Sequence, residues 1–240
     1  MSVRLAGGPV IPNFGRGDSC VTGDHTFCWS WVKAHWGDTL QPALVQHIEL
    51  TAIAIGIGFV LAFTLALVAH RYRRAEQPIG VLSALLYTIP SLALFQILVP
   101  FTGITRTTVE VALVAYTLVI LFPNIVAGLR SAPDDVLEAA HGMGLTRRQV
   151  LTRVELPLAV PAIIGGLRIA VVSTIAIATI AAFLLPQGLG YPIFYAVKLP
   201  TPFKTEIYAA GVLAIALALS CDAALVAVKR VLVPWSRRTT

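Results

Sequence analysis

Residues 138–157 read E-A-A-H-G-M-G-L-T-R-R-Q-V-L-T-R-V-E-L-P, a polar and charged island between two long apolar segments. The island opens with helix-forming residues, is interrupted by Gly142 and Gly144, and closes with Leu156-Pro157 at the start of the next apolar run. Charged side chains are expensive in lipid, so a chain otherwise suited to the bilayer has to place this island in water. We therefore expect a docking surface held at the membrane face.

The composition outside the island is that of a membrane protein. Of the 240 residues, 57% are hydrophobic and only 12% are charged, whereas soluble domains carry about 25% charged residues. The net charge of +6 is the kind of basic excess that cytoplasmic loops of membrane proteins carry. The basic residues form no patch interleaved with aromatic ones, so we expect the lipid bilayer as a partner and no nucleic acid.

Five apolar segments are long enough to cross about 30 Å of hydrocarbon, which takes roughly 20 helical residues. We place these segments at 48–69, 79–100, 109–129, 158–185 and 207–228. Backbone groups in lipid must bond within their own segment, so the sequence predicts an all-α membrane protein with about five transmembrane helices. The predicted division is an extracytoplasmic segment at 1–46, a transmembrane domain at 47–230 that contains the loop 131–157, and a cytoplasmic tail at 231–240.

The orientation follows from the distribution of basic residues. One side of the spans carries eleven of the 18 Lys and Arg residues and the other side six, with Arg168 inside the fourth span. Because basic residues accumulate on the cytoplasmic side, we expect the N-terminus outside and the C-terminus and the island inside.

The extracytoplasmic segment contains two cysteines, Cys20 and Cys28, eight positions apart. An oxidising compartment favours a disulfide between them. The alternative is that both thiols stay reduced. No metal site is expected, because His25 between them is not joined by a second ligand pair with metal-site spacing.

Three tryptophans, Trp29, Trp31 and Trp36, precede the first span. Tryptophan prefers the headgroup region, which predicts an interfacial helix over residues 29–46. Its role is either an ordinary anchor for the first span or a gate for the substrate, and we rate the anchor at least as highly.

The island follows a long spaced pattern: E-A-A, three residues, G, nine residues, an aliphatic residue, one residue, L-P. In this respect the chain resembles permease subunits of ATP-binding-cassette (ABC) importers that work with a solute-binding protein. Val154 stands where that family prefers isoleucine, an exchange that keeps shape and apolarity. The residues themselves suit the assignment, because Ala139 and Ala140 favour a helix with low relief and Gly144 can turn the chain with a positive φ.

The resemblance implies a bacterial plasma-membrane permease with a type I importer fold, in which the island forms a cytoplasmic coupling helix. The resemblance assigns contacts with the ATPase to Glu138, Ala139, Ala140 and Gly144. It also implies that two further residues brace the loop against the fourth span, Leu156 and Pro157. The chain lacks the G-x-x-x-x-G-K-[S/T] pattern, so it is expected to be no enzyme and to hold no cofactor, with ATP and Mg²⁺ in a separate ATP-binding subunit. The other implied partners are a second permease copy or paralogue and an extracytoplasmic solute-binding protein.

Shorter motifs at 88–92 (T-I-P-S-L), 165–168 (G-G-L-R) and 188–190 (G-L-G) resemble the osmoprotectant branch, which takes up glycine betaine, choline and carnitine. Methionine-type amino-acid importers share the loop and a similar topology, so they remain the alternative. A stand-alone secondary transporter is a second alternative, although neither coupling-ion sites nor a filter is evident.

Three polar or helix-breaking residues inside the predicted spans are candidates for the translocation pathway: Pro90, Ser91 and Asn124. Pro90 removes a backbone hydrogen bond and predicts a kink, which either lines the pathway or is static. Asn124 either lines the pathway or bonds across helices. For Arg168 we favour a structural ion pair or a snorkelling side chain over substrate contact.

Overall fold

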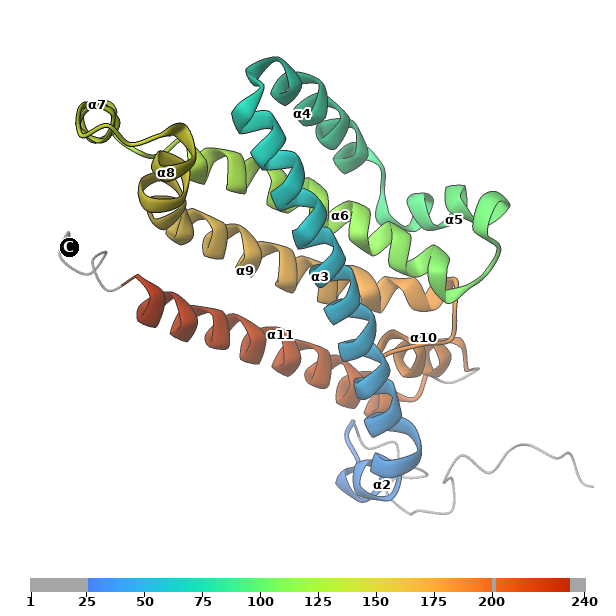
Figure 1. Ribbon diagram of the computed structural model, residues 1–240. Helices are drawn as coiled ribbons and strands as arrows, with labels where there is room; N and C mark the ends of the chain where they lie inside the picture. Colours follow the sequence, from blue (N-terminus) through green and yellow to red (C-terminus); the bar gives the residue numbers. More distant parts are fainter. Residues whose placement is uncertain (1–25, 200–201, 234–240) are drawn as a thin grey trace, which may run out of the picture.

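The computed structural model describes residues 26–199 and 202–233, and the regular elements in these ranges are all helices. Four of them belong to helical stretches long and apolar enough to cross a membrane: α3 (Gln41–Arg71), α6 (Arg106–Leu129), α9 (Leu156–Ile180) and α11 (Lys204–Leu232). Figure 1 shows α6, α9 and α11 side by side, with α3 crossing them. These helices confirm four of the five predicted spans.

The remaining predicted span, 79–100, is not one helix. It consists of α4 (Arg73–Thr88) and α5 (Ser91–Thr102), which are bent by 103° relative to each other. Pro90 cannot donate a backbone hydrogen bond, and Ile89 before it is extended with φ −75° and ψ 123°. The expected kink is therefore a complete break, and the hydroxyl of Tyr116 donates to the carbonyl of Ile89 there.

The broken pair nevertheless runs the length of α6. At one end, Glu76 of α4 pairs with Arg130, which follows α6. At the other end, the hydroxyl of Thr102 in α5 lies 2.7 Å from that of Thr108 in the first turn of α6. We therefore count α4 and α5 together as the fifth span.

Small residues allow the central helices to pack closely, as is common between membrane helices. A Cβ atom added to Gly58 of α3 would lie 2.6 Å from Thr117 Cγ2 of α6. A Cβ atom added to Gly166 of α9 would lie 2.5 Å from the Cβ of Asn124. The hydroxyls of Thr117 and Thr174, 3.0 Å apart, add a hydrogen bond between α6 and α9.

The N-terminal helix differs from the predicted one over 29–46. Only α2 (Trp29–Ala34) is separate, because a π-helical turn at Trp36–Leu40 continues directly into α3. Trp31 is buried and meets the ring of Phe203 edge-on at 5.0 Å, whereas Trp29 is exposed. Trp31 thus anchors α2 to the start of α11, and Trp29 keeps the exposure expected of an interfacial tryptophan. Cys20 lies outside the described residues, so the Cys20–Cys28 disulfide stays a prediction.

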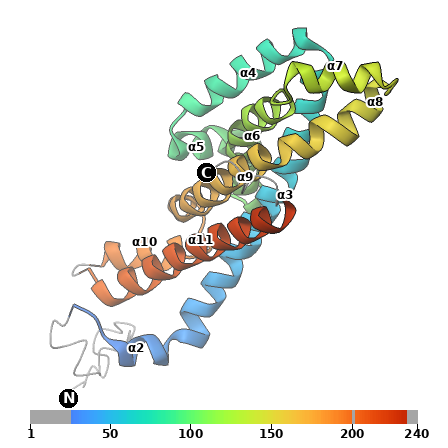
Figure 2. The same ribbon diagram turned by 90° about the vertical axis from the view of Figure 1, so that its left-hand side faces the viewer.

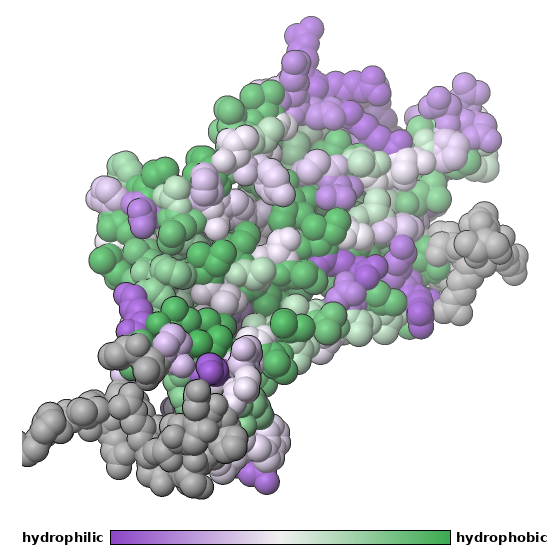
Figure 3. All heavy atoms as spheres, turned by 180° about the vertical axis from the view of Figure 1, so that it is seen from behind, coloured by the Kyte–Doolittle hydropathy of each residue, from purple (hydrophilic) through white to green (hydrophobic). Residues whose placement is uncertain are grey.

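The two ends of the molecule carry different elements. Figure 2 places α7 (Asp134–Gly142) and α8 (Arg147–Val150) at one end and α2 with α10 (Gly190–Lys198) at the other. Figure 3 shows apolar residues over much of the surface, with hydrophilic ones gathered where α3 joins α4, at α7 and near the C-terminal half of α11. This distribution fits a bundle that spans a membrane with α7 in water.

Candidate coupling loop and transport pathway

The polar island begins with a short helix that projects beyond the end of α6. Pro133 is its N-cap, with ψ 147°, and its carbonyl accepts the N–H groups of Val136 and Leu137. Asp134 and Asp135 occupy the first turn, where a negative charge complements the positive end of the helix dipole. Helix α7 is thus capped at its start, and among the described elements α8 is the one that makes more than weak contacts with it.

Gly144 turns the chain at the end of α7. Its φ of +80° is in the left-handed region, which confirms the conformation predicted for this residue. The N–H of Gly144 donates to the carbonyl of His141 at 2.9 Å, and that of Leu145 donates to the carbonyl of Ala140 at 3.2 Å. These bonds satisfy the last turn of the helix and reverse the chain toward the bilayer.

The returning arm is continuous with the fourth span. A capping box between Thr146 and Gln149 starts α8, and a π-helical turn at Leu151–Glu155 leads into α9. The result is an unbroken helical stretch, Arg147–Phe183, of 37 residues. The returning arm and the fourth span are therefore parts of one helical stretch.

The four predicted ATPase contacts do not share one environment. Glu138, Ala139 and Gly144 are exposed, whereas Ala140 is buried against its own chain. An exposed residue that the pattern did not single out is Met143, which is 73% exposed between the two glycines. A methionine in a loop that must lie in water is the signal that would have found it, because such flexible apolar side chains suit contact surfaces.

The two predicted bracing residues lie at the start of α9. Leu156 packs against a buried cluster contributed by α3, α6 and α9, and Pro157 is half-buried in the first helical turn, where proline is tolerated. A contact that the sequence did not predict joins the returning arm to α3: His70 Nε2 lies 3.0 Å from Glu155 Oε2.

The three pathway candidates separate into two places. Pro90 and Ser91 lie at the break between α4 and α5. The side chain of Asn124 donates to the carbonyl of Ile120 at 2.7 Å and packs on Gly166. Asn124 thus belongs to the contact between α6 and α9.

Arg168 and Asp222 form an ion pair with two hydrogen bonds between α9 and α11. Arg168 Nε donates to Oδ1 at 2.7 Å, and Nη2 donates to Oδ2 at 2.9 Å. The expectation of a structural ion pair for Arg168 is confirmed. Among the described residues, no group of three or more His, Cys, Asp or Glu side chains is placed to hold a metal ion.

The G-L-G motif at 188–190 is anchored on α3. Gly188 has φ +66°, and its N–H donates to Gln46 Oε1 at 3.2 Å. The N–H of Leu189 donates to Nδ1 of the fully buried His47 at 3.2 Å, which leaves Nε2–H to donate to the carbonyl of Ile175 at 3.2 Å. One neutral imidazole therefore joins the 188–190 loop, α3 and α9.

The combination of a broken span, a projecting helix and a returning arm continuous with α9 agrees with the match of residues 54–238 to a family model described as "Binding-protein-dependent transport system inner membrane component". The chain belongs to this family. It is a membrane permease component of an ABC importer.

Two curated relatives of the permease support the same assignment. The choline transport system permease protein OpuBB of Bacillus subtilis (strain 168) is 32% identical over 205 residues, which cover 85% of this chain and 93% of that protein. The carnitine transport permease protein OpuCB of Listeria monocytogenes is 32% identical over 167 residues, covering 69% of this chain and 76% of that protein.

The permease also shares its fold with a chain of a solved transporter. A structure described as an inward-facing conformation of the MetNI methionine ABC transporter matches with a TM-score of 0.72 at 18% identity, over 83% of this chain and 98% of that one. This likeness confirms the predicted type I importer fold.

Proposed function

We propose that this permease imports a quaternary-amine osmoprotectant, such as glycine betaine, choline or carnitine, by ATP-driven alternating access. The observation that carries the proposal is the 32% identity to a choline permease protein over 205 residues. Two of the motifs that resemble this branch occupy structurally specialised places. The T-I-P-S-L segment forms the break between α4 and α5, and the G-L-G segment forms the outer loop held by His47.

In the proposed cycle, ATP and Mg²⁺ are bound by a separate ATP-binding subunit on which α7 docks. The exposed Glu138, Ala139 and Met143 form the contact surface. Closure of the ATP-binding subunits moves the loop, and the continuous stretch Arg147–Phe183 carries this movement into the bilayer. The contact of Glu155 with His70 passes part of this movement to α3.

The pathway in this proposal lies between two permeases, either identical or paralogous. An extracytoplasmic solute-binding protein captures the substrate, so the permease itself needs no aromatic cage for the ammonium group. The positive charge of Arg168 does not oppose a cationic substrate, because Asp222 compensates it with two hydrogen bonds.

Transport by the reconstituted system tests the proposal. Proteoliposomes would contain the permease with its ATP-binding subunit and internal ATP, and the solute-binding protein would be added on the outside. We expect uptake of radiolabelled choline, glycine betaine or carnitine that requires ATP, and no uptake of methionine. Methionine uptake in place of these amines would overturn the substrate class. Uptake by the permease alone would instead identify a secondary transporter.

A further inference from the structure

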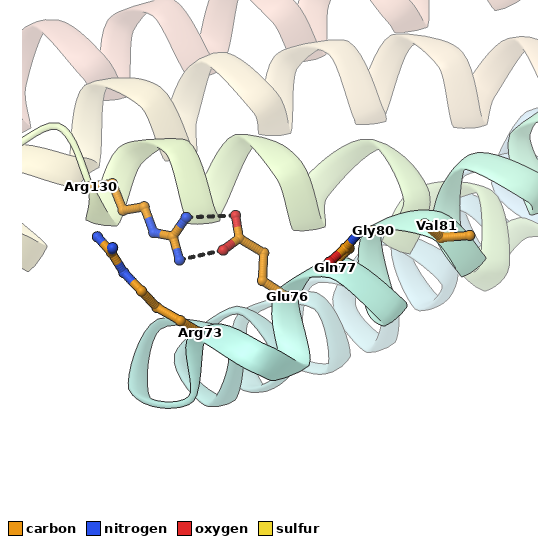
Figure 4. A pocket seen from close by; sticks show the side chains of 6 residues that line it. All are labelled: Arg73, Glu76, Gln77, Gly80, Val81 and Arg130. Carbon is orange, nitrogen blue, oxygen red and sulfur yellow. Dashed lines mark hydrogen bonds and ion pairs between the residues drawn. The ribbon is translucent and has the colours of Figure 1, made fainter.

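A cavity of about 660 Å³ opens between the start of α4 and the end of α6 (Figure 4). This volume is within the range of about 300–1,000 Å³ that is usual for ligand sites. Six residues line the cavity: Arg73, Glu76, Gln77, Gly80, Val81 and Arg130. Five of them belong to α4, at positions 73, 76, 77, 80 and 81. This spacing, three and four residues from one turn to the next, places them on one face of the helix.

The cavity carries one positive charge in excess. Arg130 Nη1 donates to Glu76 Oε1 at 2.6 Å, and a second contact joins Nη2 to Oε2, so this carboxylate is fully engaged. Figure 4 shows the side chain of Arg73 extending toward the end of α6 that carries Arg130. Within residues 26–199 and 202–233, Arg73 forms no ion pair. A guanidinium in this position suits a phosphate group, which it can bind with two parallel hydrogen bonds.

The cavity continues into an apolar stripe. Val81 and Leu85 follow Arg73 and Gln77 at four-residue intervals on the same face of α4, and they are 54% and 59% exposed. A Cβ atom added to Gly80 would meet nothing within 4 Å, so the cavity is open above this residue. The arrangement offers a cationic head site at the membrane surface and an apolar track that leads from it toward the middle of the bilayer.

We propose that this cavity binds the phosphate headgroup of an anionic phospholipid from the cytoplasmic leaflet, with one acyl chain along Val81 and Leu85. The distribution of basic residues places the start of α4 on the cytoplasmic side, where basic sites attract anionic lipids. A soluble phosphate would use only the charged end of the site, whereas a phospholipid uses both the charge and the apolar stripe. The lipid would join α4 to Arg130, the residue immediately before the coupling loop at 131–157.

Native mass spectrometry of the whole transporter tests this proposal. The complex would be taken from nanodiscs of mixed phosphatidylglycerol and phosphatidylcholine, and the lipids that remain bound would be counted. We expect retained phosphatidylglycerol, and about a tenfold lower bound fraction in Arg73→Gln, the effect of losing one charge-assisted contact. Arg74→Gln is the matched control, because Arg74 is the adjacent arginine and does not line the cavity.

A second variant acts without changing the charge. Gly80→Leu would fill the open space above Gly80 and is expected to lower phosphatidylglycerol retention as well. Subunit stoichiometry and melting temperature, read on the same samples, show that each variant is assembled.

Four results would overturn the proposal. Equal loss in Arg73→Gln and Arg74→Gln would indicate diffuse surface charge, and equal retention of the two lipids would exclude selection of an anion. Displacement of the lipid by glycerol phosphate in solution would indicate a soluble anion site. Loss of a protein subunit from the Arg73→Gln complex would indicate a protein contact.

Discussion

His70 Nε2 in α3 lies 3.0 Å from Glu155 Oε2 at the point where the arm of the coupling loop enters α9. Both side chains are largely buried, with exposed fractions of 23% and 13%. The contact joins two residues 85 positions apart and links the arm to the first span. In the proposed cycle, movement of α7 therefore reaches α3 as well as α9.

Removing this link should weaken coupling without abolishing ATP hydrolysis. Glu155→Ala is expected to lower the amount of substrate transported per ATP severalfold, at a cost in stability of about 1 kcal/mol for one hydrogen bond. Glu155→Gln keeps an acceptor for His70 and should preserve most of the coupling. Parallel uptake and phosphate-release assays give the ratio, and an unchanged ratio in Glu155→Ala would show that the contact plays no part in coupling.

Replacing the turn glycine should uncouple the loop. Gly144→Val places a β-branched side chain at φ +80°, which costs about 1–3 kcal/mol and is expected to disturb the end of α7. The variant should reach the membrane in normal amounts yet lose most of its uptake. Gly142→Ala is the control, since Gly142 is helical with open space around it. Equal uptake by Gly144→Val and the control would argue against the role of the turn.

The close approach of α6 and α9 makes a packing prediction. Gly166→Ala puts a Cβ atom 2.5 Å from the Cβ of Asn124 and should destabilise the permease by about 1–3 kcal/mol. Gly165→Ala, where nothing lies within 4 Å, should leave the melting temperature unchanged. Thermal unfolding in detergent checks both. Similar melting temperatures for the two variants would mean that the helices are not packed at Gly166.

The ion pair between α9 and α11 predicts rescue by charge reversal. Arg168→Asp and Asp222→Arg should each lower the yield of folded permease, because two like charges then face each other in a bilayer-spanning region. The double variant restores opposite charges and should recover much of the yield. Size-exclusion chromatography of the three variants measures this, and a double variant no better than the single ones would show that the pair contributes little.

Local signals in the sequence were sufficient for much of the fold. Four spans follow from apolar length alone, and the turn at Gly144 follows from the spacing of the island. Pro90 predicts a kink, whereas the structure has a break of 103° at this position. The proline and the extended Ile89 together end α4, and the hydroxyl of Tyr116 donates a hydrogen bond to the carbonyl of Ile89.

The sequence pattern does not predict contacts between residues that are far apart in the chain. Arg168 was expected to pair, but its partner depends on how α9 packs on α11. The bonds of His47 to the outer loop and of His70 to Glu155 join residues far apart in the sequence. Ala139 and Ala140 are adjacent and chemically identical, and only the direction in which α7 faces makes one exposed and the other buried.

A photo-crosslink from α7 tests directly whether this helix docks on the ATP-binding subunit. A benzoyl-phenylalanine residue would replace Met143, which is 73% exposed, and separately Tyr208, which is 49% exposed in the first part of α11. After ultraviolet irradiation of the assembled, ATP-hydrolysing transporter, we predict an adduct between the permease and the ATP-binding subunit from position 143 and none from position 208. An active complex without an adduct from position 143, or with one from position 208 instead, would contradict docking through α7.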